Sequence, residues 1–124
     1  MIAGVGLDLC NVERMKHACE SEAFCRKVYT ERELAYAAER ARRAETLAGM
    51  FAAKEAFAKA TGLGISRIGL KSVEVVHGPE GKPTLFIAEG CPLPDYLRKS
   101  RLFLSISHDA GIAAAVVVIE TEGE

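Results

Sequence analysis

The chain has 124 residues, of which 49% are hydrophobic and 27% are charged. This composition excludes a disordered chain, and the length predicts a single domain over residues 1–124, because a second core would need more residues. So small a domain has little interior for an enclosed cleft, so an enzyme of this size is expected to build its site between subunits. The net charge of −1 argues against general nucleic-acid binding.

The cysteines and the hydropathy pattern indicate a cytoplasmic protein. The four cysteines show no C-x-x-C spacing, and no histidine is placed to complete a zinc site. The N-terminal residues lack the pattern of a signal peptide, and no apolar run approaches the roughly 20 residues that span a bilayer. We therefore expect reduced, mainly structural thiols and no association with a membrane.

The first third of the chain is predicted to form one strand and the start of three helices. Residues 2–8 are apolar and punctuated by glycine, which favours a buried strand. Asn11 and Ser21 are suitable N-caps for two short helices. Thr30 and Glu33 match the capping-box pattern, which predicts that a further helix begins there.

A helix-favouring segment rich in Ala, Glu, Arg and Leu runs from Glu31 to Ala60. One straight helix of this length would span about 45 Å at roughly 1.5 Å per residue. That length exceeds the diameter expected of so small a domain. We therefore predict a break near residues 42–45 and then a main helix to Ala60, ended by Gly62 and Gly64.

The second half changes to the two-residue period of strands. "LKSVEVVH" and "PTLFIAE" flank a turn-rich connector at residues 77–82 and predict a hairpin. Pro94 suits the first turn of a short helix. "RLFLSIS" and "GIAAAVVVIE" flank a tight turn at residues 108–111 and predict a second antiparallel pair. The predicted fold class is α+β, with helices mainly in the first half packed on a largely antiparallel sheet.

The charged residues of the helical segment have two interpretations. Arg40, Arg42 and Arg43 form either a local basic patch for an acidic partner or part of a solvated helix face. Four glutamates would balance that solvated face: Glu31, Glu33, Glu39 and Glu45. We favour the solvated face for each of these residues taken singly, and we expect His17 and His77 to lie at the surface.

Glu55 is the first candidate for chemistry, in the segment "MFAAKEAFAK". On a helix Phe51, Glu55 and Lys59 share one face, whereas Lys54 points about 100° away. Spacing alone favours a surface Glu–Lys pair, which contributes about 0.3–0.5 kcal/mol. The neighbouring alanines and phenylalanines leave little polar surface, however, and a carboxylate in such surroundings requires a partner stronger than water. We assign no role to Lys54 from the sequence.

Asp8 is the second candidate, because it follows six uncharged residues at the end of the predicted strand. One interpretation is an ordinary cap of the turn or helix that follows. The other is a ligand for a hard cation, because Mg²⁺ is usually held by carboxylates from different elements together with waters and phosphate oxygens. Both interpretations stay open, because nothing in the spacing shows that Asp8 and Glu55 meet.

His108 follows a strand that contains Ser105 and Ser107, which share a face. It is either an ordinary loop residue or part of a small anion-binding edge. A Ser–His hydrolase is not supported, because the chain has no G-x-S-x-G motif. The glycine-rich stretches also lack the remaining residues of a P-loop or of a dinucleotide-binding motif.

Five segments resemble, in order, the holo-acyl-carrier-protein synthase family, the small 4′-phosphopantetheinyl transferases of bacteria. They are "GVGLDLCNVERM", "VYTERELAY", "LAGMFAAKEAFAKATGLGI", "GKPTL" and "LSISHDAGIAAAVVV". The resemblance covers nearly the whole chain. Its most specific pieces are G-x-D, matched by Gly6-Leu7-Asp8, and F-x-x-K-E-A-x-x-K, matched by residues 51–59.

Enzymes of that family move the 4′-phosphopantetheine arm of coenzyme A to a serine of apo acyl carrier protein in fatty-acid synthesis, releasing adenosine 3′,5′-bisphosphate. The resemblance implies that Asp8 and Glu55 hold Mg²⁺ and that Lys59 lies against the pyrophosphate. These residue types suit a phosphoryl transfer, which depends mostly on alignment and charge neutralisation. The resemblance also implies a homotrimer with interfacial sites, in which the neighbouring chain supplies further residues that bind coenzyme A: Ser105, Ser107 and His108.

The resemblance also assigns residues to the carrier protein. Arg14 matches the arginine of the family's first helix, which helps to dock the acidic carrier. Arg42 and Arg43 are candidates to bind either the 3′-phosphate of coenzyme A or the carrier. The serine proton goes either to Glu55 or to a metal-bound water. The alternative function is a non-catalytic module that binds coenzyme A or mediates trimeric interactions.

Overall fold

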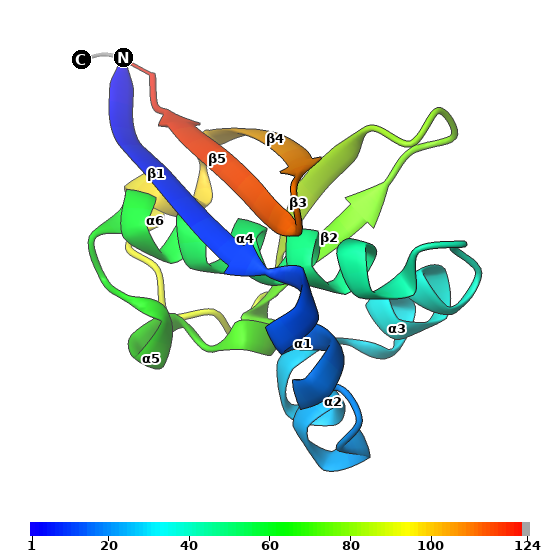
Figure 1. Ribbon diagram of the computed structural model, residues 1–124. Coiled ribbons are helices and arrows are strands. Elements are labelled where there is room, and N and C mark those ends of the chain that lie inside the picture. Colours follow the sequence, from blue (N-terminus) through cyan, green and yellow to red (C-terminus); the bar gives the residue numbers. More distant parts are fainter. Residues whose placement is uncertain (123–124) are drawn as a thin grey trace.

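A three-stranded antiparallel sheet packs against one long helix in the computed structural model (Figure 1). The structure describes residues 1–122, and Gly123 and Glu124, the end of the expected domain, lie outside the described residues. The strand order is β1-β5-β4. These elements are β1 (Ile2–Asn11), β4 (Arg101–Asp109), β5 (Ile112–Glu120) and the helix α4 (Arg43–Thr61).

The other elements surround this pair of layers. A separate antiparallel hairpin consists of β2 (Val73–His77) and β3 (Pro83–Ile87). The short helices are α1 (Val12–Ala18), α2 (Glu22–Val28), α3 (Glu31–Ala38), α5 (Ile65–Ile68) and α6 (Asp95–Arg98), with a 3₁₀ turn η1 (Leu70–Ser72). Helices α1 and α2 project from the end of β1 (Figure 1). The predicted α+β class is confirmed.

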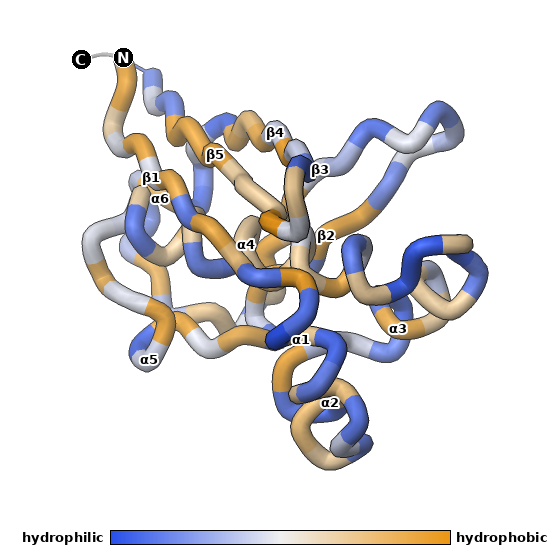
Figure 2. Tube along the Cα trace, viewed as in Figure 1, coloured by the Kyte–Doolittle hydropathy of each residue, from blue (hydrophilic) through white to orange (hydrophobic). Residues whose placement is uncertain are grey.

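Helix α4 forms the centre of the core. Eleven of its 19 residues are buried, so it is enclosed on most sides and has no single apolar stripe. Strand β5 packs on it through alternate residues, and Figure 2 shows the apolar character of β1 and β5. The β5 side chains buried against the helix layer are Ala113, Ala115, Val117 and Ile119.

The two ends of the described chain meet at the start of β1. The Met1 ammonium lies 2.6 Å from Thr121 O, and Thr121 N donates to Met1 O at 2.8 Å. No helix within residues 1–122 is long and apolar enough to cross a membrane.

The local helix signals of the sequence are present in the structure. Asn11 Oδ1 accepts from Arg14 N at 2.8 Å, and Ser21 Oγ accepts from Phe24 N at 3.2 Å. Thr30 and its capping-box partner exchange both hydrogen bonds. Each of these three helix starts is therefore confirmed.

Two predicted boundaries differ from the structure. The break in the helical segment was placed too late, because α3 ends at Ala38 and α4 begins at Arg43. Arg42 has φ −114° and ψ 69°, which is not helical. Strand β1 continues past residue 8 to Asn11, because β5 supplies pairing partners as far as Ile112.

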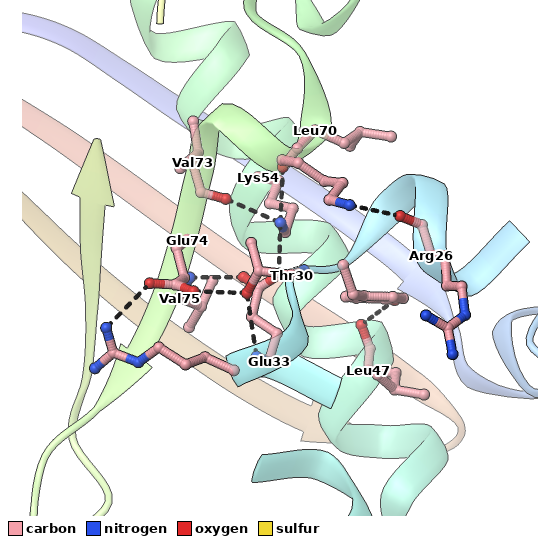
Figure 3. Close-up of polar contacts among 12 residues, drawn as sticks. Arg26, Thr30, Glu33, Leu47, Lys54, Leu70, Val73, Glu74 and Val75 are labelled. Atoms are coloured by element: carbon pink, nitrogen blue, oxygen red, sulfur yellow. Dashed lines mark hydrogen bonds and ion pairs between the residues drawn. The ribbon is translucent and has the colours of Figure 1, made fainter. Parts of the chain in front are cut away.

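Two opposite charges, Glu33 and Lys54, are enclosed in the core (Figure 3). Both side chains are 0% exposed, and Lys54 Nζ lies 2.8 Å from Glu33 Oε1. The prediction that Glu33 belongs to a solvated face is therefore wrong, whereas Glu31 and Glu39 are exposed as expected. Glu33 faces inward because its carboxylate also accepts hydrogen bonds from two main-chain amides, Thr30 N and Val75 N.

The surface position predicted for His77 is correct only in part, because His77 is half-buried, whereas His17 is exposed as predicted. His77 ends β2 and stacks on Tyr36 of α3, with ring centroids 4.0 Å apart and an interplanar angle of 4°. Its Nδ1 is buried and has no hydrogen-bond partner among the described residues. Burial, with a smaller effect from the charge of Arg40, lowers the pKa of His77 below 6.5.

The lowered pKa of His77 predicts a pH dependence of stability. The unfolded chain binds this proton more tightly, so the free energy of unfolding rises with pH between the lowered pKa and about 6.5. His77→Phe keeps an aromatic ring against Tyr36 and removes the titration. We expect urea unfolding of the variant to depend less on pH in this window than that of the wild type. An unchanged slope in His77→Phe would contradict the assignment.

Candidate active site between β1 and α4

The G-x-D motif lies where β1 crosses α4. Gly4, Gly6 and Asp8 face the helix together, because side chains alternate along a strand. A Cβ atom at Gly4 would lie 2.0 Å from Ala60 O, and one at Gly6 would lie 1.9 Å from Ala56 O. The strand can therefore rest directly on the helix backbone only with glycine at these positions, and this contact brings Asp8 beside α4.

The carboxylate of Asp8 meets α4 through Lys59. Lys59 Nζ lies 2.8 Å from Asp8 Oδ1 and donates to Leu7 O at 3.2 Å. The Asp8 side chain is 17% exposed and that of Lys59 is 56% exposed. The hydrogen bond to Asp8, and then its charge, raise the pKa of Lys59. The interpretation of Asp8 as a helix cap is wrong, because Asn11 caps α1.

Glu55 lies on α4 one turn before Lys59. Partial burial is the main cause that raises the pKa of Glu55, and the negative charge of Asp8 adds to it, whereas Lys59 lowers it. Because Glu55 shares a face of α4 with Lys59, which pairs with Asp8, the Glu55 carboxylate lies on the side of the helix that Asp8 approaches. The structure thus brings together Asp8, Glu55 and Lys59, a meeting that residue spacing did not establish.

This donor set fits a hard divalent cation. In the described part of the chain, no three His, Cys, Asp or Glu side chains are grouped to hold a metal ion. Asp8 and Glu55 would therefore supply two carboxylate ligands, and water and phosphate oxygens would supply the others, as is usual for Mg²⁺. A cation between the carboxylates would also offset the repulsion that contributes to the raised pKa of Glu55.

Ser105, Ser107 and His108 lie apart from Asp8 within one chain. Strand β5 separates β4 from β1. The two serines are exposed on the sheet face opposite α4, because they alternate with residues packed toward the helix. His108 lies on the helix side, where its Nε2 is 2.8 Å from Glu45 O. Glu45 precedes Glu55 by about 15 Å of helix.

The surroundings of His108 combine two of the segments singled out in the sequence, "GKPTL" and "SISH". A cavity of about 230 Å³ is lined by Tyr36, Thr46, Gly49, His77, Gly81, Pro83, Ile106 and His108. A smaller polar cavity places Arg42 beside His108, whereas Arg43 lines a different cavity with Cys19 and Cys25. Arg42, rather than Arg43, therefore lies near the histidine.

Arg14 borders an apolar cavity of about 260 Å³ at the junction of β1, α1, α2 and α4. Its lining is Leu9, Cys10, Asn11, Arg14, Met15, Ala18, Phe24 and Phe51. Phe51 precedes Glu55 by one helical turn, so this cavity adjoins the carboxylates. Helical spacing predicts that Phe51 shares a face with Glu55, but it does not predict the cavity, because Phe24 comes from a separate element.

The family of the chain follows from comparison with known proteins. A model of the 4′-phosphopantetheinyl transferase superfamily matches residues 4–117, and the chain belongs to this family. The holo-(acyl-carrier-protein) synthase of Fusobacterium nucleatum is 37% identical over 123 residues, which cover 96% of this chain and 99% of the relative. That of Chloroherpeton thalassium is 40% identical over 121 residues, which cover 95% and 98%.

Solved structures agree with this assignment. A holo-(acyl-carrier-protein) synthase from Bacillus anthracis, in complex with CoA (3′,5′-ADP), superposes with a TM-score of 0.82 at 34% identity, over 98% of this chain and 99% of the other. The holo-(acyl-carrier-protein) synthase of Neisseria meningitidis gives a TM-score of 0.86 at 33% identity, over 98% and 100%.

The close contact of β1 with α4 can be tested at Gly6. Gly6→Ala places a methyl group against Ala56 O, so we expect the free energy of unfolding to fall by about 1–3 kcal/mol, as in overpacked cores. Gly90→Ala is the matched control, because its added Cβ meets no atom within 4 Å. Urea unfolding measures both. Equal stability of the two variants would contradict the contact.

Proposed function

We propose that this chain transfers the 4′-phosphopantetheine arm of coenzyme A to a serine of apo acyl carrier protein and releases adenosine 3′,5′-bisphosphate. The meeting of Asp8, Glu55 and Lys59 at the crossing of β1 and α4 carries this proposal. The names of the relatives and the complex of the Bacillus anthracis relative with coenzyme A support the substrates.

The residues of the site supply charge and alignment, and the nucleophile is the serine of the carrier. Asp8 and Glu55 would hold Mg²⁺, which when bound neutralises charge on the pyrophosphate oxygens. Lys59 has three donors, of which Asp8 and Leu7 O engage two, so a third is available for a phosphate oxygen. The serine proton passes either to Glu55 or to a water held at the site.

We also propose a homotrimer with its sites between neighbouring copies. The sheet face opposite α4 exposes large apolar side chains: Val5 60%, Leu7 60%, Leu9 64% and Phe103 47%. A contiguous apolar face of this kind is typical of an interface. Ser105 and Ser107 are exposed on the same face. His108 of β4 lies beside Glu45, about 15 Å along α4 from Glu55. The two serines and His108 would therefore reach the carboxylates of a second copy rather than those of their own chain.

The cavity beside Arg14 is the proposed docking site of the carrier protein. It offers an exposed cation, an apolar lining and, through Phe51, a direct approach to Glu55. A carrier with an acidic and partly apolar surface would place its serine at the carboxylates when it docks there. Arg43 belongs to another cavity, on the side of α2, and is proposed as a second contact for the carrier or the 3′-phosphate.

The proposed setting is fatty-acid synthesis in the cytoplasm, with residues 1–124 acting as one domain. The four cysteines are free thiols, which fits a reducing compartment. A non-catalytic module that only binds coenzyme A or other subunits would have no use for two carboxylates that repel each other beside Lys59.

Asp8→Asn and Glu55→Gln test the transferase directly. Each variant removes one carboxylate charge without changing the size of the side chain, so we expect Mg²⁺-dependent arm transfer to fall by about 100-fold or more. Transfer is measured as the mass gain of apo acyl carrier protein, and circular dichroism should find both variants folded. Glu39→Gln, on the exposed end of α3, is the control. Wild-type transfer rates in both site variants would refute the proposal and favour the non-catalytic module.

Complementation tests whether the site lies between copies. Asp8→Asn chains retain His108, and His108→Ala chains retain Asp8, so a mixed trimer contains some sites in which both halves are intact. Random association gives about one quarter of such sites. We expect co-refolding of two poorly active variants to restore transfer toward that fraction of the wild-type rate. A mixture as inactive as its parents would place the whole site within one chain.

A further inference from the structure

Lys54, the neighbour of Glu55 in sequence, is engaged on the opposite side of α4 from β1. Its ammonium donates to Leu70 O at 2.7 Å and to Val73 O at 2.9 Å, and it pairs with Glu33 Oε1 at 2.8 Å (Figure 3). A lysine has three donors, and all three are used. These contacts tie α4 to α3 and to the segment that leads into β2.

Glu33 is held as firmly as Lys54. Its Oε1 also accepts from Thr30 N at 2.9 Å, and its Oε2 accepts from Val75 N at 2.7 Å. Thr30 Oγ1 in turn donates to Glu74 Oε2 at 2.6 Å. The acceptor for Lys54 therefore cannot shift without breaking a helix cap and a contact to β2.

Lys54 shares its face of α4 with three large buried side chains: Leu47, Met50 and Phe57. Toward β1, by contrast, the buried side chains of the helix are alanines, and Gly4 and Gly6 of the strand present bare backbone to them. Apolar contacts are not directional, whereas the three hydrogen bonds from Lys54 have preferred directions and so add a specific orientation to this packing.

We propose that Lys54 is a positioning residue whose bonds to Glu33, Leu70 O and Val73 O set the rotation of α4 and so aim Glu55 at Asp8. Successive helical residues differ by about 100°, so fixing the direction of Lys54 also fixes that of Glu55. This inference rests on the proposed Mg²⁺ site.

Stability alone is a poor reason for this buried pair. Replacing a buried ion pair by apolar groups of similar volume is often neutral or stabilising, whereas removing one partner leaves an uncompensated charge. A variant that removes both charges therefore separates the two roles. It restores the fold if the pair is merely tolerated, and it keeps a defect at Glu55 if the pair directs the helix.

The experiment compares Lys54→Met with the double variant Glu33→Gln, Lys54→Met. The single variant leaves the Glu33 charge buried without its partner, so we expect a large loss of thermal stability. In the double variant both charges are gone, but one of the two main-chain amides that donate to Glu33, Thr30 N or Val75 N, then faces the glutamine NH₂, so we expect the thermal midpoint to recover only in part. Lys71→Met is the matched control, because Lys71 also donates to a carbonyl, Arg26 O, but does not contact α4 in this way.

The decisive measurement is the binding of Mn²⁺, a hard divalent probe, followed by electron paramagnetic resonance in saturating coenzyme A. We expect the recovered double variant to bind Mn²⁺ about 10-fold or more weakly, the size of effect typical of residues that orient metal ligands. Its kcat for arm transfer should fall while its KM for the carrier protein stays unchanged. Lys71→Met should bind Mn²⁺ as the wild type does.

The outcomes separate this inference from the proposed function. A folded double variant with wild-type Mn²⁺ affinity and wild-type kcat overturns the positioning role and leaves the metal site intact. A wild-type protein that binds no Mn²⁺, or that binds it no better than Asp8→Asn, overturns the proposed metal site itself.

Discussion

The direct contact of β1 with the backbone of α4 is the constraint on which the site depends. Gly4 and Gly6 leave no side chain between strand and helix, and Asp8 is the next residue on the same face of the strand. The strand therefore delivers its carboxylate within reach of Lys59. In this chain the glycine and the aspartate of the G-x-D motif act together, because the glycine sets the distance between β1 and α4 and so the distance from Asp8 to Lys59.

The two sides of α4 have different roles. The side toward β1 and β5 is smooth and permits close approach, and it carries the polar residues of the candidate site at its edge. The side toward α3 and β2 is held by directed bonds from a single buried ammonium. Burial lowers the pKa of Lys54, whereas the charge of Glu33 and its hydrogen bond oppose that effect. Lys54, the buried charge of this largely apolar helix, therefore has all its partners on the side of α4 away from the candidate site.

The sequence predicted what depends on local contacts. The caps at Asn11, Ser21 and Thr30 are formed by residues three positions apart, so their patterns were sufficient. For Glu33, the sequence predicted the capping role, which is local, but not the pairing with Lys54, which is not local. That pairing, like the meeting of Asp8 with Lys59, joins distant elements, and no residue pattern reports how two elements cross. The partial burial of His77 was missed for the same reason, since it comes from the Tyr36 ring on α3.

The pairing of Met1 with Thr121 bears on how the molecule can be handled. Both described ends leave the fold together, beside the start of β1, and seven residues of extended strand, about 23 Å, separate Met1 from Asp8. An affinity tag or fluorescent protein fused at either end would emerge from the same point, remote from the carboxylates. A short peptide linking the two ends would close the chain into a ring, and new termini could then be opened in the exposed turn between β2 and β3.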